Sequence, residues 1–160
     1  PHVFGEVKAD NAHQVELNWE QIKLKEKDGN RSVLSGVPST LPSLIKAYRI
    51  QEKAANVGFD WEEREQVWEK FQEEASEFRA EAGSGDKEKM KQEMGDLLFS
   101  LVNVARLYGI HPDEALELTN RKFIARFGHV EARAKASGRN LKDMTLAEMD
   151  ALWNEAKETE

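Results

Sequence analysis

Two short acidic segments have the residue types and spacing needed to bind a divalent cation. Residues 73–77 read Glu-Glu-Ala-Ser-Glu, residues 93–96 read Glu-Met-Gly-Asp, and 15 residues separate the segments. They contribute five carboxylates: Glu73, Glu74, Glu77, Glu93 and Asp96. Within each segment, acidic residues three or four positions apart share one face of a helix. Each helix therefore presents a carboxylate cluster.

A cluster of this kind needs a compensating charge. Two negative charges 4 Å apart repel by about 4 kcal/mol at an effective dielectric of 20, so the carboxylates must be protonated, paired or bound to metal. Lys89 and Lys91 are near in sequence but face elsewhere on their helix, and we assign no Arg to the acidic stripe. Ligands that are all oxygen suit Mg²⁺, which fills its other positions with water and substrate phosphate. The pattern predicts a divalent ion that binds a phosphate ester.

The helices that carry the two segments should form a hairpin. We expect one helix from the Asp60/Glu63 cap to residue 82, a turn at residues 83–85, and a second helix over 86–107. The second is apolar around most of its circumference, which predicts that it is largely buried. One polar stripe runs along it: Glu93, Asp96, Ser100 and Asn103. The carboxylates of both helices would then meet in one cleft.

The rest of the chain also follows a helical period. Further helices are expected over residues 10–27, 42–56, 112–127 and 145–157, with Gly128 ending the third of these and a basic stretch at 132–143. No convincing strand is found. Short loops between helices of this length predict an all-α antiparallel bundle.

Composition excludes several classes of protein. Thirty Asp and Glu against 23 Lys and Arg give a net charge of −7, the wrong sign for a protein that binds nucleic acid through its phosphates. Without cysteine there is no thiolate nucleophile or Cys-bound metal. The longest apolar stretch, residues 94–110, is interrupted by charged residues, so no membrane association is expected, and we expect a cytoplasmic location. The Glu-x-x-His motif of di-iron bundles is absent.

Groups that could bind phosphate lie further along the chain. Lys122 and Arg126 are four residues apart, on one face of the expected helix over 112–127. Two cations on one face can bind phosphate oxygens, although such pairs are also common on solvent-exposed helices. Trp153 can either stack on a base or fill a core.

Three longer segments resemble the MazG family of all-α nucleoside triphosphate pyrophosphohydrolases. Residues 47–61 (AYRIQEKAANVGFDW), 93–99 (EMGDLLF) and 120–123 (NRKF) carry the resemblance, together with the carboxylate spacing. The likeness covers nearly the whole chain.

The resemblance also implies a domain arrangement, because MazG proteins contain two tandem copies of the domain. Residues 1–30 are then the tail of a preceding, truncated MazG-like domain, 31–41 a linker and 42–160 the catalytic domain. A weak internal repeat agrees with this. The order His-Val then Trp-x-x-x-Lys occurs within residues 2–23 and again within 129–157.

The resemblance further implies Mg²⁺-dependent hydrolysis of nucleoside triphosphates to monophosphate and pyrophosphate, with Mn²⁺ able to substitute, by a homodimer. The implied metal ligands are Glu74, Glu77, Glu93 and Asp96, while Glu73 or Glu74 accepts the proton of the attacking water. The implied substrate-binding residues are Lys122, Arg126, Trp153, Asn103 and Lys53, with Lys53 near the base.

The sequence is also compatible with two other functions. The chain could be a catalytically silent helical interaction module that kept the scaffold. It could instead be a house-cleaning pyrophosphatase specific for deoxynucleotides or damaged nucleotides. Hydrolysis assays distinguish the three.

Overall fold

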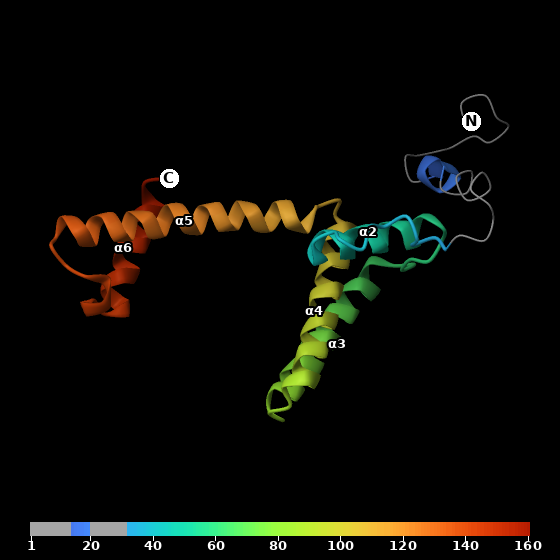
Figure 1. Ribbon diagram of the computed structural model, residues 1–160, viewed down its shortest axis with the longest axis horizontal. Coiled ribbons are helices and arrows are strands. Elements are labelled where there is room, and N and C mark those ends of the chain that lie inside the picture. Colours follow the sequence, from blue (N-terminus) through green and yellow to red (C-terminus); the bar gives the residue numbers. More distant parts are fainter. Residues whose placement is uncertain (1–13, 20–31) are drawn as a thin grey trace. The chain divides into compact units, whose positions relative to one another are not determined.

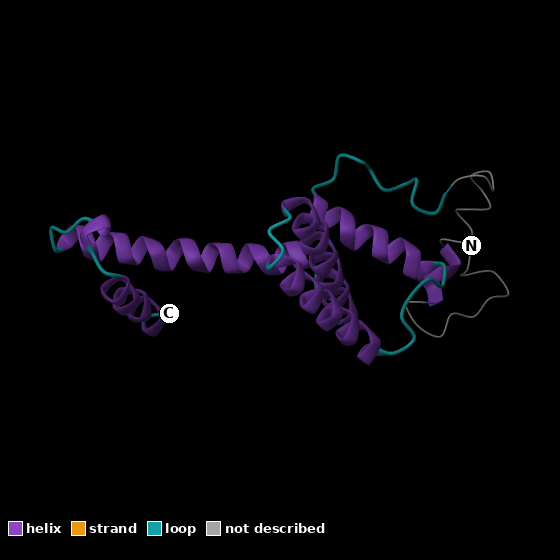
Figure 2. Ribbon diagram, turned by 90° about the horizontal axis from the view of Figure 1, so that it is seen from below, coloured by secondary structure: helices purple, strands orange, loops and turns teal. Residues whose placement is uncertain are grey.

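The chain is built from helices. A computed structural model describes residues 14–19 and 32–160, and within these ranges every regular element is helical (Figures 1 and 2). The described residues form two compact units, one ending at Asp113 and the other comprising Glu114–Glu160. The all-α prediction is confirmed for this part of the chain. Of the helix predicted over 10–27, residues 14–19 are helical and the remainder lies outside the described residues.

The first unit contains helices α2 (Ser43–Asn56), α3 (Arg64–Ala82) and α4 (Lys87–Leu107). Helix α4 packs along α3 as a hairpin and also contacts α2, as both ribbon views show. The hairpin turn uses Gly85 at φ 76°, a conformation that glycine adopts without strain. Asp86 then caps α4 by accepting hydrogen bonds from the backbone N–H groups of Glu88 and Lys89, both at 3.2 Å. The predicted turn and the bounds of α4 are confirmed.

The start of α3 differs from the prediction. Its N-cap is Glu63, which exchanges hydrogen bonds with Gln66 in a capping box. Asp60, the predicted cap, lies three residues earlier and binds Arg106 of α4 instead. The sequence pattern Asp60-x-x-Glu63 therefore marks a loop anchor rather than a helix end, because a long-range ion pair outcompetes the local cap.

Helix α4 is less buried than predicted. Ser100, Val102 and Val104 are buried, but the side chains of Met94, Leu98 and Leu101 are 36%, 49% and 46% exposed. These three residues recur at i, i+4 and i+7 and form one face, which we call the outer α4 face. The prediction that α4 is largely buried is therefore wrong for the single chain. Helices α2 and α3 cover the side of α4 opposite the outer α4 face and leave that face exposed.

The second unit consists of the rest of α5 (Pro112–Ala136), a short 3-10 helix η1 (Leu141–Asp143) and α6 (Leu146–Glu158). Gly128 does not end α5, as the sequence had suggested. The helix continues to Ala136 and stops before Gly138, which has φ 69°. Val130 and Ala134 in the added turns are buried, so packing extends the helix beyond a tolerated internal glycine. The predicted capping box of Thr145 and Glu148 is confirmed at the start of α6.

Across residues 14–19 and 32–160, none of the helices combines the length and the apolar character that spanning a bilayer requires.

Candidate metal and nucleotide site

Three of the five predicted carboxylates converge between α3 and α4. Glu74 and Glu77 come from α3 and Glu93 from α4, and one oxygen of each lies within 4.8 Å of the others. The convergence follows from the hairpin, because Glu74 and Glu77 are three positions apart on one helix face and the turn at 83–86 places Glu93 opposite them. We call these three residues the carboxylate cluster.

Two oxygens of the cluster are buried without a partner. Glu74 is only 5% exposed, and among the described residues no group donates a hydrogen bond to its Oε2 atom or to Oε2 of Glu93. A buried polar atom left unpaired costs about 1–3 kcal/mol, and more when it is charged. These oxygens are therefore available to a cation.

The other oxygen of Glu74 is already paired with a lysine. Lys70 Nζ lies 2.9 Å from Glu74 Oε1 and 3.4 Å from Glu73 Oε2. The hydrogen bond to Glu74 raises the pKa of Lys70 above its ordinary value, so Lys70 stays charged at neutral pH. Lys70 thus compensates only part of the negative charge of the carboxylate cluster.

Glu77 experiences the remaining repulsion. Its pKa is raised above the ordinary value of 4.5, chiefly by the charge of Glu74, then by loss of solvent and by the charges of Glu93 and Glu73. Raised carboxyl pKa values with like-charged neighbours are typical of sites that bind metal or perform catalysis.

This pKa shift predicts how stability depends on pH without metal. The folded protein holds the Glu77 proton to a higher pH than the unfolded chain does, so the free energy of unfolding falls as pH rises through the window just above 4.5. In EDTA at neutral pH we expect Glu77→Gln to be more stable than wild type in urea unfolding, since the amide removes the repulsion. Glu69→Gln, an exposed change on the same helix, serves as the control. A Glu77→Gln protein that is less stable than wild type would contradict the proposed repulsion.

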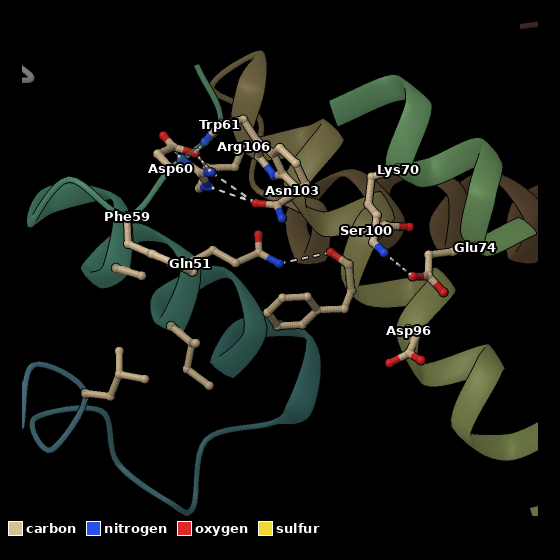
Figure 3. A pocket seen from close by; sticks show the side chains of 14 residues that line it. Gln51, Phe59, Asp60, Trp61, Lys70, Glu74, Asp96, Ser100, Asn103 and Arg106 are labelled. Atoms are coloured by element: carbon tan, nitrogen blue, oxygen red, sulfur yellow. Dashed lines mark hydrogen bonds and ion pairs between the residues drawn. The ribbon is translucent and has the colours of Figure 1, made fainter. Parts of the chain in front are cut away.

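A cavity of about 750 Å³ extends along α4 from Glu74, the member of the carboxylate cluster that lines it (Figure 3). Glu74 and Lys70 of α3 and Asp96, Ser100 and Asn103 of α4 line it. Asp96 is exposed and faces the cavity one turn beyond Glu93, so a ligand held there can be reached from both helices. Three of the four residues of the polar stripe predicted along α4, all except Glu93, thus line one wall of the cavity.

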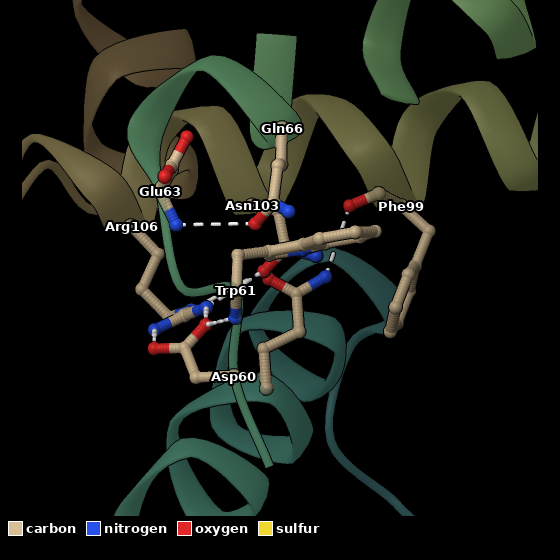
Figure 4. A network of polar contacts seen from close by, with 8 residues as sticks. Asp60, Trp61, Glu63, Gln66, Phe99, Asn103 and Arg106 are labelled. Atoms are coloured by element: carbon tan, nitrogen blue, oxygen red, sulfur yellow. Dashed lines mark hydrogen bonds and ion pairs between the residues drawn. The ribbon is translucent and has the colours of Figure 1, made fainter. Parts of the chain in front are cut away.

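Arg106 continues that polar stripe. Its guanidinium donates to both carboxylate oxygens of Asp60, at 2.7 and 3.2 Å, and to Asn103 Oδ1, from Nη2 at 3.0 Å and from Nε at 3.3 Å (Figure 4). The backbone N–H of Trp61 donates to Asp60 Oδ1 at 2.8 Å. This network holds the loop between α2 and α3 against the far end of the cavity.

The other predicted substrate residues lie elsewhere. Lys53 is half-buried in the last turn of α2 and does not line the cavity. Lys122, Arg126 and Trp153 belong to the second unit. There Arg126 lies over the Trp153 ring, 5.7 Å from its centre, and binds Glu160 through two hydrogen bonds of 2.7 and 2.8 Å. Phe123 also packs on Trp153, with ring centres 5.0 Å apart, while Lys122 is exposed.

Sequence reasoning missed Lys70, Arg106 and Gln51. Lys70 could have been found, because it precedes Glu74 by four residues, the spacing of a helical ion pair. Arg106 lies three residues after Asn103, so it belongs to the polar stripe of α4, to which the sequence analysis assigned no arginine. No local signal identifies Gln51, which enters the cavity only because α2 packs on α4.

The chemistry of the donor set fits a hard divalent cation. All candidate ligands are carboxylate oxygens, two of them are buried and unpaired, and the cavity beside them provides room for further oxygen ligands. An all-α hairpin with such a cluster is typical of helical proteins that can hold a divalent cation between acidic helices.

The sequence of the chain is similar to a known domain and to several known proteins. Residues 62–131, which contain α3, α4 and the carboxylate cluster, match the model of the MazG nucleotide pyrophosphohydrolase domain. The whole chain is 40% identical to a nucleoside triphosphate pyrophosphohydrolase of Escherichia coli strain K12, of which it covers 62%. It is 38% identical over 98% of its length to the nucleoside triphosphate pyrophosphohydrolase/pyrophosphatase MazG of Thermotoga maritima, of which it covers 59%. It is also 53% identical to YabN of Bacillus subtilis, of which it covers 33%.

Residues 62–131 therefore match a MazG nucleotide pyrophosphohydrolase domain, and the resemblance drawn from the sequence is confirmed. The chain spans about three fifths of the two pyrophosphohydrolases it matches.

Proposed function

We propose that the protein hydrolyses nucleoside triphosphates to nucleoside monophosphate and pyrophosphate in a Mg²⁺-dependent reaction. The observation that carries the proposal is the carboxylate cluster, which has two buried and unpaired oxygens and whose Glu74 lines a cavity large enough for a nucleotide. The match of residues 62–131 to the MazG nucleotide pyrophosphohydrolase domain supports the same activity.

Glu74, Glu77, Glu93 and Asp96 would hold the Mg²⁺ ion, and Mn²⁺ should substitute for it. When bound, the ion supplies positive charge that neutralises the triphosphate and stabilises the leaving pyrophosphate. Nothing in the donor set favours a softer metal, because no sulfur or nitrogen ligand lies in the cluster.

The side chains themselves would orient and deprotonate the attacking water. Water adds to a phosphorus while the anhydride bond between the α- and β-phosphates breaks, and pyrophosphate carries the bond electrons away. Glu73 or Glu74 accepts the water proton; both lie on α3 beside Lys70. Lys70 is charged, pairs with Glu74 Oε1 and borders the cavity, so it would be placed to contact a phosphate oxygen while Glu74 Oε2 stays available to the ion.

Lys122, Arg126 and Trp153 remain our proposed contacts from the second unit. Arg126 and Trp153 form one cation–aromatic pair, which offers a charged and a flat apolar surface together. In this proposal Lys122 and Arg126 bind phosphates, Trp153 lies near the nucleotide, and Asn103 contributes from α4. Lys53 stays a proposed neighbour of the base.

The direct test is a product assay. The protein is incubated with Mg²⁺ and a panel of ribo-, deoxy- and oxidised triphosphates, and the products are separated by chromatography. Monophosphate with pyrophosphate supports the proposal, whereas diphosphate with phosphate would assign a different phosphohydrolase. Activity confined to deoxy or oxidised substrates would indicate a house-cleaning role. No product from any substrate would favour a silent interaction module.

We also propose that the protein is a homodimer. The outer α4 face exposes Met94, Leu98 and Leu101 in one row, and apolar rows of this kind commonly mark an interface. Light scattering after size exclusion should give twice the mass of the chain, and Leu98→Glu should give the mass of one chain. A wild-type protein that runs as a monomer at micromolar concentration would contradict the proposal.

A further inference from the structure

The cavity has two chemically different ends. Lys70, Glu74 and Asp96 form the charged end, while Gln51, Phe59 and Trp61 lie at the other, with Ser100 and Asn103 between (Figure 3). Along α4, Asp96 and Asn103 are seven residues apart, or about 10 Å at 1.5 Å per residue. A ligand whose phosphates lie at the carboxylates therefore extends its other end toward Gln51 and the aromatic side chains.

Gln51 presents an unpaired acceptor to this second end. Gln51 is buried, with only 5% of its surface exposed, and its Nε2 donates a hydrogen bond to the backbone oxygen of Phe99 at 2.9 Å. A carbonyl oxygen only accepts, so the amide nitrogen must face Phe99 and Oε1 must face away. Among the described residues no group donates to that Oε1, which Figure 3 shows turned toward Asn103 and Trp61.

The side-chain amide of Asn103 is also held in one orientation by its hydrogen-bond partner, Arg106. Asn103 Oδ1 accepts from two guanidinium nitrogens of Arg106, so its Nδ2 is the group that this side chain can offer to a ligand. Arg106 itself is neutralised by two hydrogen bonds to Asp60. This end of the cavity thus offers one neutral acceptor, one neutral donor and no uncompensated positive charge for a phosphate.

Aromatic surface completes this end. The side chains of Trp61 and Phe99 line the cavity and are 42% and 41% exposed, so parts of their surfaces are open to a ligand. The Asp60–Trp61 hydrogen bond and the Asp60–Arg106 pair hold Trp61 in place (Figure 4). Nucleobases stack on such side chains whichever base is present, because every base has a π-face.

From this arrangement we propose that Gln51 is a base-recognition residue whose Oε1 accepts a hydrogen bond from an N–H group of the nucleobase, beside Trp61 and Phe99. The inference rests on the proposed function, since it assigns the phosphates to the carboxylate cluster. Every common base has an amino or imino N–H group, so this contact distinguishes nucleotides from inorganic polyphosphate without choosing one base.

The test compares ATP with purine riboside triphosphate, whose ring lacks the 6-amino group and has no N–H on that edge. With saturating Mg²⁺, wild-type kcat/KM should be about 10–100-fold lower for purine riboside triphosphate, because the buried acceptor stays unpaired. Gln51→Leu should bring the ratio of the two kcat/KM values close to one. Gln72→Leu, on the exposed side of α3, should keep the wild-type ratio.

The outcomes separate the inference from the proposed function. Equal kcat/KM for both substrates in wild type would overturn the role of Gln51 while leaving triphosphate hydrolysis intact, and this comparison needs no variant to fold. A Gln51→Leu protein with a wild-type melting curve and an unchanged preference for ATP would also overturn it. Hydrolysis of neither substrate would overturn both the inference and the proposed function.

Discussion

Glu74→Gln is expected to lower Mg²⁺-dependent release of pyrophosphate by about a hundredfold or more. Changes next to a metal ligand typically cost about 10–100-fold in metal affinity or activity, so loss of a direct ligand should cost at least as much. Glu74 is the most buried member of the carboxylate cluster, and its Oε2 has no other partner among the described residues. Glutamine keeps the shape of the side chain and removes its charge.

The measurement is kcat/KM at several Mg²⁺ concentrations, with circular dichroism to verify the fold. Glu69→Gln removes a carboxylate from the exposed side of the same helix and should retain wild-type activity. Asp96→Asn should behave like Glu74→Gln, because Asp96 lines the cavity beside the cluster. Full activity in a folded Glu74→Gln protein would remove Glu74 from the site.

Magnesium should also stabilise the fold, by about 2.7 kcal/mol at a concentration a hundredfold above its Kd. The physical reason is that the ion binds the folded state, where three carboxylates converge, and not the unfolded chain, where they are apart. The ion relieves the repulsion that raises the pKa of Glu77. The gain should therefore be largest above the pH at which Glu77 ionises.

Urea unfolding with MgCl₂, compared with NaCl at equal ionic strength, separates specific binding from charge screening. Wild type should gain stability only with MgCl₂, and Glu93→Gln should lose most of that gain. An unfolding curve that is identical in the two salts would show that the cluster does not bind magnesium tightly.

Local sequence signals predicted the helices that carry the site. Asp86 and Gly85 define the start of α4, and Thr145 with Glu148 defines the start of α6, because each contact joins residues close in sequence. The grouping of Glu74, Glu77 and Glu93 also follows from spacing and a short turn. The metal-binding role of these residues and of Asp96 stays a prediction.

Features that depend on long-range packing could not be read from the pattern. Asp60 looked like a helix cap because its partner Arg106 lies 46 residues away. Gly128 looked like a helix end, but buried contacts at Val130 and Ala134 carry α5 past it. The spacing of apolar residues in α4 indicates how much of the helix surface is apolar. It does not indicate which apolar face packs against α2 and α3 and which one, the outer α4 face, stays exposed.

Anomalous diffraction from a crystal soaked in Mn²⁺ would locate an ion among the carboxylates, since Mn²⁺ prefers the same oxygen ligands as Mg²⁺. We expect a manganese peak between α3 and α4, within bonding distance of oxygens from Glu74, Glu77 and Glu93. Carboxylates that point apart into solvent with no peak among them would contradict it.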